Sequence, residues 1–277
     1  TYMRTDSTSL ASSAIEEARA YIRAQFGANY LPKEARVYKT KTKGAQEAHE
    51  AVRPTSIERV PDSLKADLNR DQLRLYDLIW RRMLASQMAN ATYDTTTVVV
   101  EAQSSKSKSM YLFRATGSQP KFLGFEVLYT EGKDDALEEG EAPLPMLSPT
   151  DHLDVLGLNS DQHFTKPPPR YTEASLVKLL EEKGIGRPST YAPTLSTLVD
   201  RSYVLKEQGR LKPTVLGTQV SNLLTQFFPD VMDVGFTAHM EDELDEIARG
   251  ERPWVPMLEK FYFPFKETLN AAQENMP

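Results

Sequence analysis

The sequence contains no cysteine, which excludes a disulfide framework and any Cys-ligated zinc or iron–sulfur site. This absence fits a reducing compartment. No apolar run approaches the ~20 residues that a membrane-spanning helix needs, and no signal peptide opens the chain. With 277 residues, 40% of them hydrophobic and 26% charged, the chain has the composition of a globular protein of about two ordinary domains.

The net charge of −6 is distributed unevenly along the chain. Residues 1–91 hold 15 Lys+Arg and 11 Asp+Glu, a net charge of +4, and the remainder carries −10. The overall charge argues against a simple basic nucleic-acid binder, although an anionic partner would meet the basic front part. Charge alone favours two ordinary solvated surfaces. The first residue is Thr1 rather than Met, which indicates processing or a piece of something longer.

Apolar periodicity predicts a helical first segment, a strand-rich middle segment and a helical last segment. In the first we expect helices over 13–26, with a capping box at its start, over 44–52, and from Asn69 to about 88. Strands are predicted over 95–101, 110–115, 122–129 and 152–158. After the stiff proline run 167–169, helices are predicted over 172–184, 189–201, 214–227 and 237–249. A hairpin around Gly209 gives a winged-helix-like order.

The first seven residues, TYMRTDS, place reactive side chains close together. The phenolic oxygen of Tyr2 can act as a nucleophile toward a phosphodiester. The guanidinium of Arg4 can bind the phosphate and stabilise the charge that builds on its oxygens. A surface tyrosine at a frayed chain end explains the same residues without any chemistry.

The segment QEAHEAVRP contains a histidine between two acids. Glu47 and Glu50 would raise the proton affinity of His49 if they lie close to it. A cationic His49 beside Arg53 could bind a phosphate or tune a nearby nucleophile. The alternative is a solvated amphipathic helix with an incidental histidine. Because HExxH spacing is absent, a metal site is less favoured than this alternative.

The segment GIGRPST places glycines before a helix start that carries Arg187, Ser189 and Thr190. Backbone N–H groups, hydroxyls and a cation at a helix N-terminus form an anion site. A well-capped helix after a glycine turn is about as good an interpretation. The Walker pattern is missing, which disfavours nucleoside triphosphate binding. The acidic run 241–246 is interpreted as a solvated face.

Aromatic residues outside these segments are interpreted as structural. Trp80 and Trp254 are expected in a core or an interface rather than as base-stacking platforms. The clusters at 227–228 and 261–265 are expected to pack helices together.

In their order along the chain, these segments resemble bacterial DNA topoisomerase I of the type IA family. The matching segments are TYMRTDS, QEAHEAVRPT, LYDLIWRRMLASQM, EEKGIGRPSTYA and DRSYV. The resemblance extends roughly from Tyr2 to Arg249. The related topoisomerase III branch usually has a proline where Met3 stands, and lacks the arrangement of Glu50 and Arg53, so the topoisomerase I branch is the better match.

The resemblance implies a mainly α fold with a β-rich middle segment, forming part of a four-domain torus. Residues 1–91 would be the helical domain that bears the nucleophile. Residues 92–166 would be one portion of the strand-rich arch. Residues 167–277 would be a helical base domain with contacts to a DNA groove.

The resemblance also implies roles for individual residues. Tyr2 would be the nucleophile that holds the 5′ end of a cut strand as a phosphotyrosine, and Arg4 would contact the scissile phosphate. Asp6 and His49 would form a hydrogen-bonded pair that couples protonation to DNA binding. Further contacts to DNA would come from Arg53, Arg187, Ser189, Thr190 and Arg201.

The activity implied is relaxation of negatively supercoiled DNA without ATP, by a monomer in the bacterial cytoplasm. The partner would be DNA that is single-stranded or negatively supercoiled. The family holds Mg²⁺ in an N-terminal domain that precedes the nucleophile, and only Thr1 precedes Tyr2 here. We therefore expect that this chain binds no metal and is inactive alone. The alternative function is a non-catalytic module that binds single-stranded nucleic acid.

Overall fold

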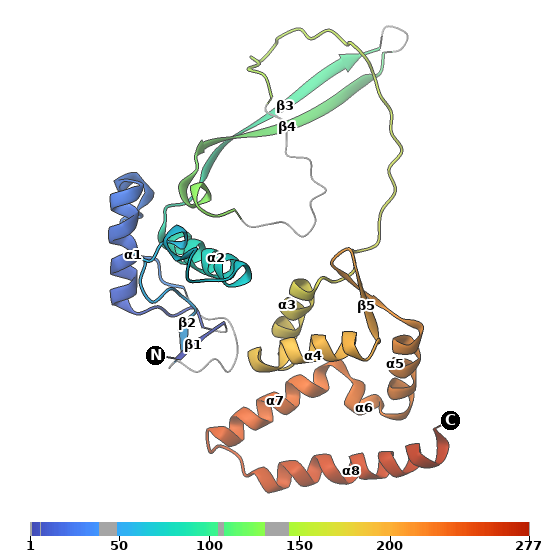
Figure 1. Ribbon diagram of the computed structural model, residues 1–277. Coiled ribbons are helices and arrows are strands. Elements are labelled where there is room, and N and C mark those ends of the chain that lie inside the picture. Colours follow the sequence, from blue (N-terminus) through green and yellow to red (C-terminus); the bar gives the residue numbers. More distant parts are fainter. Residues whose placement is uncertain (1, 6, 39–48, 105–107, 131–143, 277) are drawn as a thin grey trace. The chain divides into compact units, whose positions relative to one another are not determined.

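A computed structural model describes residues 2–5, 7–38, 49–104, 108–130 and 144–276, with the side chain of Tyr2 excepted (Figure 1). The chain divides into two compact units, each built from separate segments. Unit 1 comprises residues 1–9, 39–51 and 166–277, and unit 2 comprises residues 10–38 and 52–165. The division into 1–91, 92–166 and 167–277 stays a prediction.

Unit 2 has its core between α1 (Ser12–Gln25) and α2 (Arg70–Gln87). Ala18 and Ile22 of α1 and Leu84 of α2 are fully buried. Trp80 is also buried; its indole N–H donates to the carbonyl of Ile57 at 3.0 Å, and its ring meets Tyr21 edge to face. The core position predicted for Trp80 is confirmed. Burial of one face explains why both amphipathic segments form helices.

The two helix starts in this unit differ from one another. Asn69 caps α2, its side chain accepting from the backbone N–H groups of Asp71 and Gln72, as the predicted start at Asn69 requires. Helix α1 begins after Ala11 with no side-chain cap, so the capping box predicted at its start is wrong. Packing of the buried face is sufficient to hold this helix. Short 3₁₀ helices η1 (Ala28–Tyr30) and η2 (Pro61–Leu64) accompany α1 and α2.

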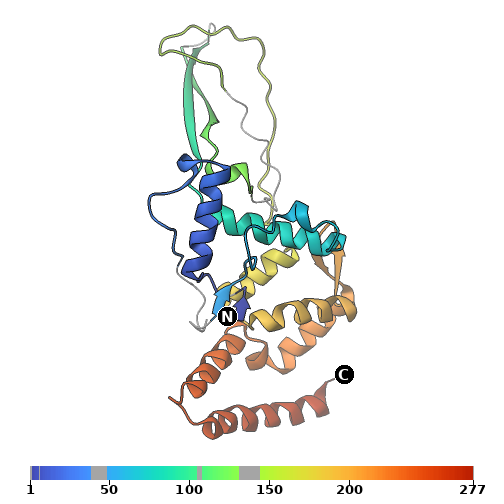
Figure 2. The same ribbon diagram turned by 60° about the vertical axis from the view of Figure 1, so that its left-hand side comes forward.

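A long antiparallel hairpin is the only sheet found among the described residues of unit 2 (Figures 1 and 2). Strand β3 (Thr92–Gln103) pairs with β4 (Met110–Phe122), so the strands predicted over 95–101 and 110–115 are confirmed. The strand predicted over 122–129 is wrong, because η3 (Gly124–Val127) follows β4 directly. The strand predicted over 152–158 is also wrong: this exposed segment has no neighbouring strand to pair with in the described part of unit 2. Alternating residues form a strand only where such a partner exists.

Unit 1 begins its long third segment with a helix–turn–helix and a hairpin. Helix α3 (Glu173–Lys183) is capped by Thr172 and is followed by α4 (Pro188–Asp200). Strands β5 (Val204–Glu207) and β6 (Arg210–Pro213) then form an antiparallel hairpin. Thr172 also makes a bridge with Arg210, which ties the start of α3 to the hairpin. The predicted helix, turn, helix and hairpin order is confirmed.

Four helices complete unit 1: α5 (Val215–Phe227), α6 (Pro229–Met232), α7 (Val234–Ala248) and α8 (Trp254–Asn275). Phe228 and Phe236 each contact an aromatic ring of α8, so the expected packing role of the aromatic clusters is confirmed. Trp254, by contrast, is 61% exposed at the start of α8 and lies in no core of the described chain.

The described chain therefore has a mixed α/β fold in which helices are the more extensive elements. In the described part of the middle segment, the strands found are the two of one hairpin, β3 and β4, rather than the four predicted. Among the described residues, no helix is both long enough and apolar enough to cross a membrane.

Candidate functional site

Two short parallel strands bring the predicted nucleophile segment next to the predicted histidine. Strand β1 (Tyr2–Arg4) pairs with β2 (His49–Ala51), and the register places Tyr2 opposite His49. Paired backbones in a sheet lie ~4.8 Å apart, so residues far apart in the sequence become neighbours. The helix predicted over 44–52 is wrong for 49–51, and 44–48 lie outside the described residues. The residues around 49–51 do not indicate by themselves that this segment pairs with a strand so distant in the sequence.

Ser7 fastens the loop after β1 to strand β2. Its hydroxyl donates to the carbonyl of His49 at 2.7 Å and accepts from the N–H of Ser9 at 3.2 Å. The N–H of Ala51 donates to the carbonyl of Ser9 at 2.7 Å. Ser7 is only 8% exposed. These bonds fix the backbone of His49 relative to the strand that carries Tyr2. Sequence reasoning missed Ser7, although it belongs to the TYMRTDS segment.

Of the other predicted residues near β1 and β2, the structure describes some and not others. Arg4 is half-buried on β1, opposite Ala51. Glu50 is 4% exposed and lies opposite Met3. Asp6 lies outside the described residues, so its predicted hydrogen bond with His49 stays a prediction.

Arg53 follows β2 but belongs to unit 2, whereas β1 and β2 belong to unit 1. Its guanidinium Nη1 donates to the carbonyl of Pro54 at 2.9 Å, and the residue is half-buried. This contact is local and leaves the predicted DNA contact of Arg53 untested.

The turn between α3 and α4 depends on two glycines. Gly184 ends α3 with φ 69°, and Gly186 has φ 77°; both angles lie in the left-handed region that favours glycine. A Cβ atom on Gly186 would also lie 2.9 Å from the hydroxyl oxygen of Thr190. That hydroxyl accepts from the N–H of Arg187 at 2.9 Å. The predicted glycine turn before a helix is confirmed here.

Three predicted DNA-contact residues, Ser189, Thr190 and Arg201, are exposed on or beside α4. Arg187 is different, because its guanidinium is held by two carboxylates of α7. Nε lies 3.0 Å from an oxygen of Glu241, and Nη2 lies 2.8 Å from an oxygen of Asp245. The interpretation of the acidic run as a solvated face is therefore wrong for these two acids, which are one helical turn apart and share a face.

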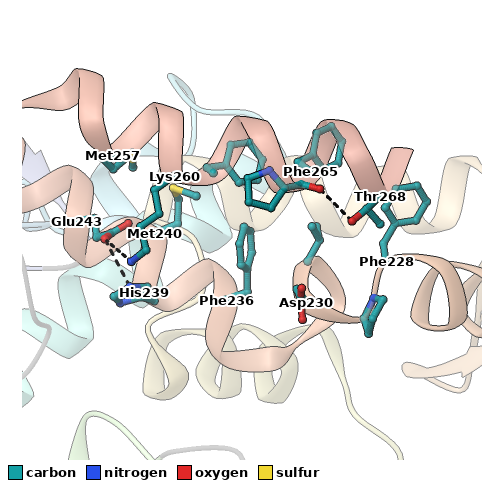
Figure 3. Close-up of a pocket in the computed structure, with 14 residues that line it drawn as sticks. Phe228, Asp230, Phe236, His239, Met240, Glu243, Met257, Lys260, Phe265 and Thr268 are labelled. Carbon is teal, nitrogen blue, oxygen red and sulfur yellow. Dashed lines mark hydrogen bonds and ion pairs between the residues drawn. The ribbon is translucent and has the colours of Figure 1, made fainter. Parts of the chain in front are cut away.

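A second side of the acidic run faces an open cavity of about 330 Å³ that is lined by residues of α6, α7 and α8 (Figure 3). Glu243 lies in its wall with a side chain only 8% exposed. Arg252 lies 2.6 Å from this carboxylate, His239 lies 3.5 Å from it, and Lys260 lies 3.8 Å from it. The rest of the lining is mostly aromatic and methionine side chains. Sequence reasoning missed this cavity, because its walls come from three separate helices.

No group of three or more His, Asp or Glu side chains that could hold a metal ion occurs among the described residues. The expectation that Mg²⁺ binds in another domain of the intact enzyme stays a prediction.

Comparison with known proteins shows the family to which the chain belongs. The family model described as DNA topoisomerase matches residues 1–259. DNA topoisomerase 1 of Xylella fastidiosa strain Temecula1 is 46% identical over 279 residues, covering 100% of this chain and 34% of that protein. DNA topoisomerase 1 of Rickettsia bellii is 46% identical over 274 residues, covering 99% of this chain and 34% of that protein.

A solved structure is similar as well. Full-length topoisomerase I from Thermotoga maritima superposes with a TM-score of 0.73 at 35% identity, covering 97% of this chain and 42% of that one. The chain therefore belongs to the DNA topoisomerase family, in its bacterial type IA topoisomerase I branch. It spans about a third of the length of the curated relatives it matches.

Proposed function

We propose that this chain carries the nucleophile and part of the DNA-binding surface of a type IA topoisomerase. The complete enzyme would relax negative supercoils by cutting one DNA strand, passing the other strand through the gap and religating the first. The observation that supports this most directly is the β1–β2 pairing, which places Tyr2 opposite His49 in a chain of the topoisomerase family.

In the proposed cleavage step the phenolic oxygen of Tyr2 attacks a backbone phosphorus. The bond from phosphorus to the 3′-oxygen breaks, the phenol loses its proton, and the departing 3′-oxygen gains one. The 5′ phosphate is then an ester of Tyr2. Attack by the 3′-hydroxyl reverses the step. Because the ester conserves the energy of the broken bond, religation needs no ATP.

Cationic side chains would support this chemistry. Arg4, on the same strand as Tyr2, would stabilise the charge on the phosphate oxygens. His49 as a cation would draw the DNA phosphate toward the segment, and Asp6 would hold it charged. The bonds from Ser7 fix the backbone of His49 for this role.

Single-stranded DNA would be held by Arg53, Arg187, Ser189, Thr190 and Arg201. Contacts to phosphate should dominate its affinity, which then falls steeply as salt is added. Mg²⁺ would be bound by a part of the complete enzyme other than the described residues.

The decisive experiment replaces Tyr2 by Phe in the complete gene product. A single-stranded oligonucleotide labelled at its 3′ end is incubated with the protein, the reaction is stopped with denaturant, and label migrating with the protein is measured. We expect Tyr2→Phe to abolish this adduct while single-strand affinity changes by less than about threefold, because only the nucleophilic oxygen is lost.

The matched control is Tyr111→Phe, which removes a phenolic oxygen from an exposed position on β4. This variant should form as much adduct as the unmodified protein. An adduct that survives in Tyr2→Phe would mean that another residue is the nucleophile. Binding without any adduct in the unmodified complete protein would instead favour the non-catalytic module.

A further inference from the structure

Two carboxylates of α7, those of Glu241 and Asp245, hold the guanidinium of Arg187. We propose that Glu241 and Asp245 are positioning residues, which orient the guanidinium of Arg187 so that it can accept a phosphate of single-stranded DNA. The inference rests on the proposed function, because it assumes that Arg187 contacts DNA. Neither acid would touch the DNA itself.

The geometry of the guanidinium allows the two acids to bind one edge of the group while a phosphate binds the other. Glu241 binds Nε at 3.0 Å, and Asp245 binds Nη2 at 2.8 Å. Both bonds lie on the Nε–Nη2 edge of the planar group. No contact to Nη1 is found among the described residues. Since a guanidinium offers five N–H donors in a rigid fork, the Nη1 side can meet a phosphate without displacing either acid.

Both ends of the arginine are fixed before any ligand arrives. Its backbone N–H donates to the hydroxyl of Thr190 at the start of α4. Its side chain is only 28% exposed, and the side chains of Glu241 and Asp245 are 23% and 32% exposed. Partly shielded, charge-assisted bonds hold one rotamer better than a solvated pair does. A long side chain that is already ordered loses less entropy when it binds phosphate.

The charge of the cluster distinguishes positioning of Arg187 from electrostatic repulsion between the two acids and DNA. The cluster of one guanidinium and two carboxylates carries a net charge of −1. If the acids acted only through charge, removing them would strengthen DNA binding. If they position Arg187, removing them weakens DNA binding even though the protein becomes less negative.

The test measures binding of a fluorescent oligo-dT by anisotropy at several salt concentrations, using the complete chain. Arg187→Ala should lower affinity several-fold and lower the salt slope by about 0.7, the value for one lost phosphate contact on a single strand. Glu241→Ala with Asp245→Ala should reproduce both losses. Combining all three substitutions should add nothing further, because the acids act only through Arg187.

Conservative and matched variants complete the design. Glu241→Gln with Asp245→Asn keeps an acceptor oxygen at each position and should retain the salt slope of the unmodified protein. Asp242→Ala, an exposed acid on the same helix, should leave the salt slope unchanged. Circular dichroism of each variant at each salt concentration checks that the helices remain folded.

Three results would overturn the proposal. Tighter binding after removal of both acids would show that they compete with DNA for Arg187. Unchanged affinity and slope would show that the ion pairs only join α4 to α7. No effect of Arg187→Ala would show that Arg187 does not contact DNA. In each case the Tyr2 adduct reports separately whether the proposed function stands.

Discussion

The helices α1 and α2 of unit 2 share one buried apolar core, whereas the helices of unit 1 combine aromatic contacts with ion pairs. Eight of the twelve apolar residues found buried in the described chain belong to the α1–α2 core of unit 2. In unit 1 the four buried apolar residues are divided among three elements: Leu195 lies on α4, Leu211 on β6, and Met257 and Ala272 on α8. Carboxylates of α7 instead bind Arg187 before α4 and Arg252 before α8.

The contrast shows how one chain can combine an apolar core with ion pairs that a ligand can rearrange. Burial of apolar area is non-directional and is not weakened by the screening of charges, so we expect moderate salt to leave the core of unit 2 intact. Ion pairs weaken with salt and can exchange partners with an anionic ligand. A unit proposed to bind a polyanion is therefore built partly from interactions that the same polyanion can influence.

The largest effect should come from Trp80→Ala in unit 2. This change removes a buried ring, its hydrogen bond to the Ile57 carbonyl and its contact with Tyr21. We expect the free energy of unfolding of unit 2 to fall by about 3–5 kcal/mol. Urea denaturation followed by far-ultraviolet circular dichroism would measure it.

The control is Leu75→Ala on the same helix, where the side chain is 58% exposed. Its effect should stay within about 0.5 kcal/mol. Equal effects of the two substitutions would contradict the apolar core as the main support of unit 2.

An intermediate effect is expected for Glu243→Ala in unit 1. The substitution leaves Arg252 with Glu246 alone, at 3.3 Å, and removes the nearest carboxylate from Lys260. We expect a loss of about 1–3 kcal/mol in the free energy of unfolding of unit 1, because a shielded charge loses its closest partner. Hydrogen exchange of the α7 and α8 amides would locate the loss.

Glu246→Ala is the matched control, since that side chain is 43% exposed and binds the same arginine. Its effect should be about 0–1 kcal/mol. If Glu246→Ala proves as costly as Glu243→Ala, burial is not what gives Glu243 its importance.

The smallest effect concerns the turn between α7 and α8. The hydrogen bond from Arg249 lowers the pKa of Glu251 below its ordinary value. A carboxylate whose pKa is lowered in the folded protein stabilises the fold at pH values above its ordinary pKa. This contribution is lost as the pH falls through the lowered pKa. Carboxyl NMR titration should show this shift, and Arg249→Gln should return the pKa of Glu251 toward its usual range. A pKa unaffected by Arg249→Gln would rule out the pair as the cause.

Much of the helical structure could be predicted from the sequence, because the signals are local. The cap at Asn69, the stop at Gly184 and the hairpin turn at Gly209 each depend on a few neighbouring residues. Prediction failed where a partner decides the outcome. Residues 152–158 alternate like a strand, but no strand partner for them is found among the described residues. His49 lies in a strand because β1 pairs with its segment.

The residues of the candidate site could be predicted from the sequence, but the hydrogen bonds and ion pairs between them could not. The reactive types in TYMRTDS and the glycine turn before Arg187 are visible in the sequence. The bonds from Ser7 to His49 and from Arg187 to the acids of α7 are not. Each joins segments separated by tens of residues, and no periodic pattern connects them.

The sequence by itself determined the family, most helix boundaries and the set of side chains available for phosphoryl chemistry, because these follow from residue type and short spacing. Only the tertiary structure decided that Tyr2 and His49 share a parallel strand pair and that Arg187 meets Glu241 and Asp245. The physical reason is that pairing and charge contacts depend on distance in space, which chain folding sets and local sequence does not.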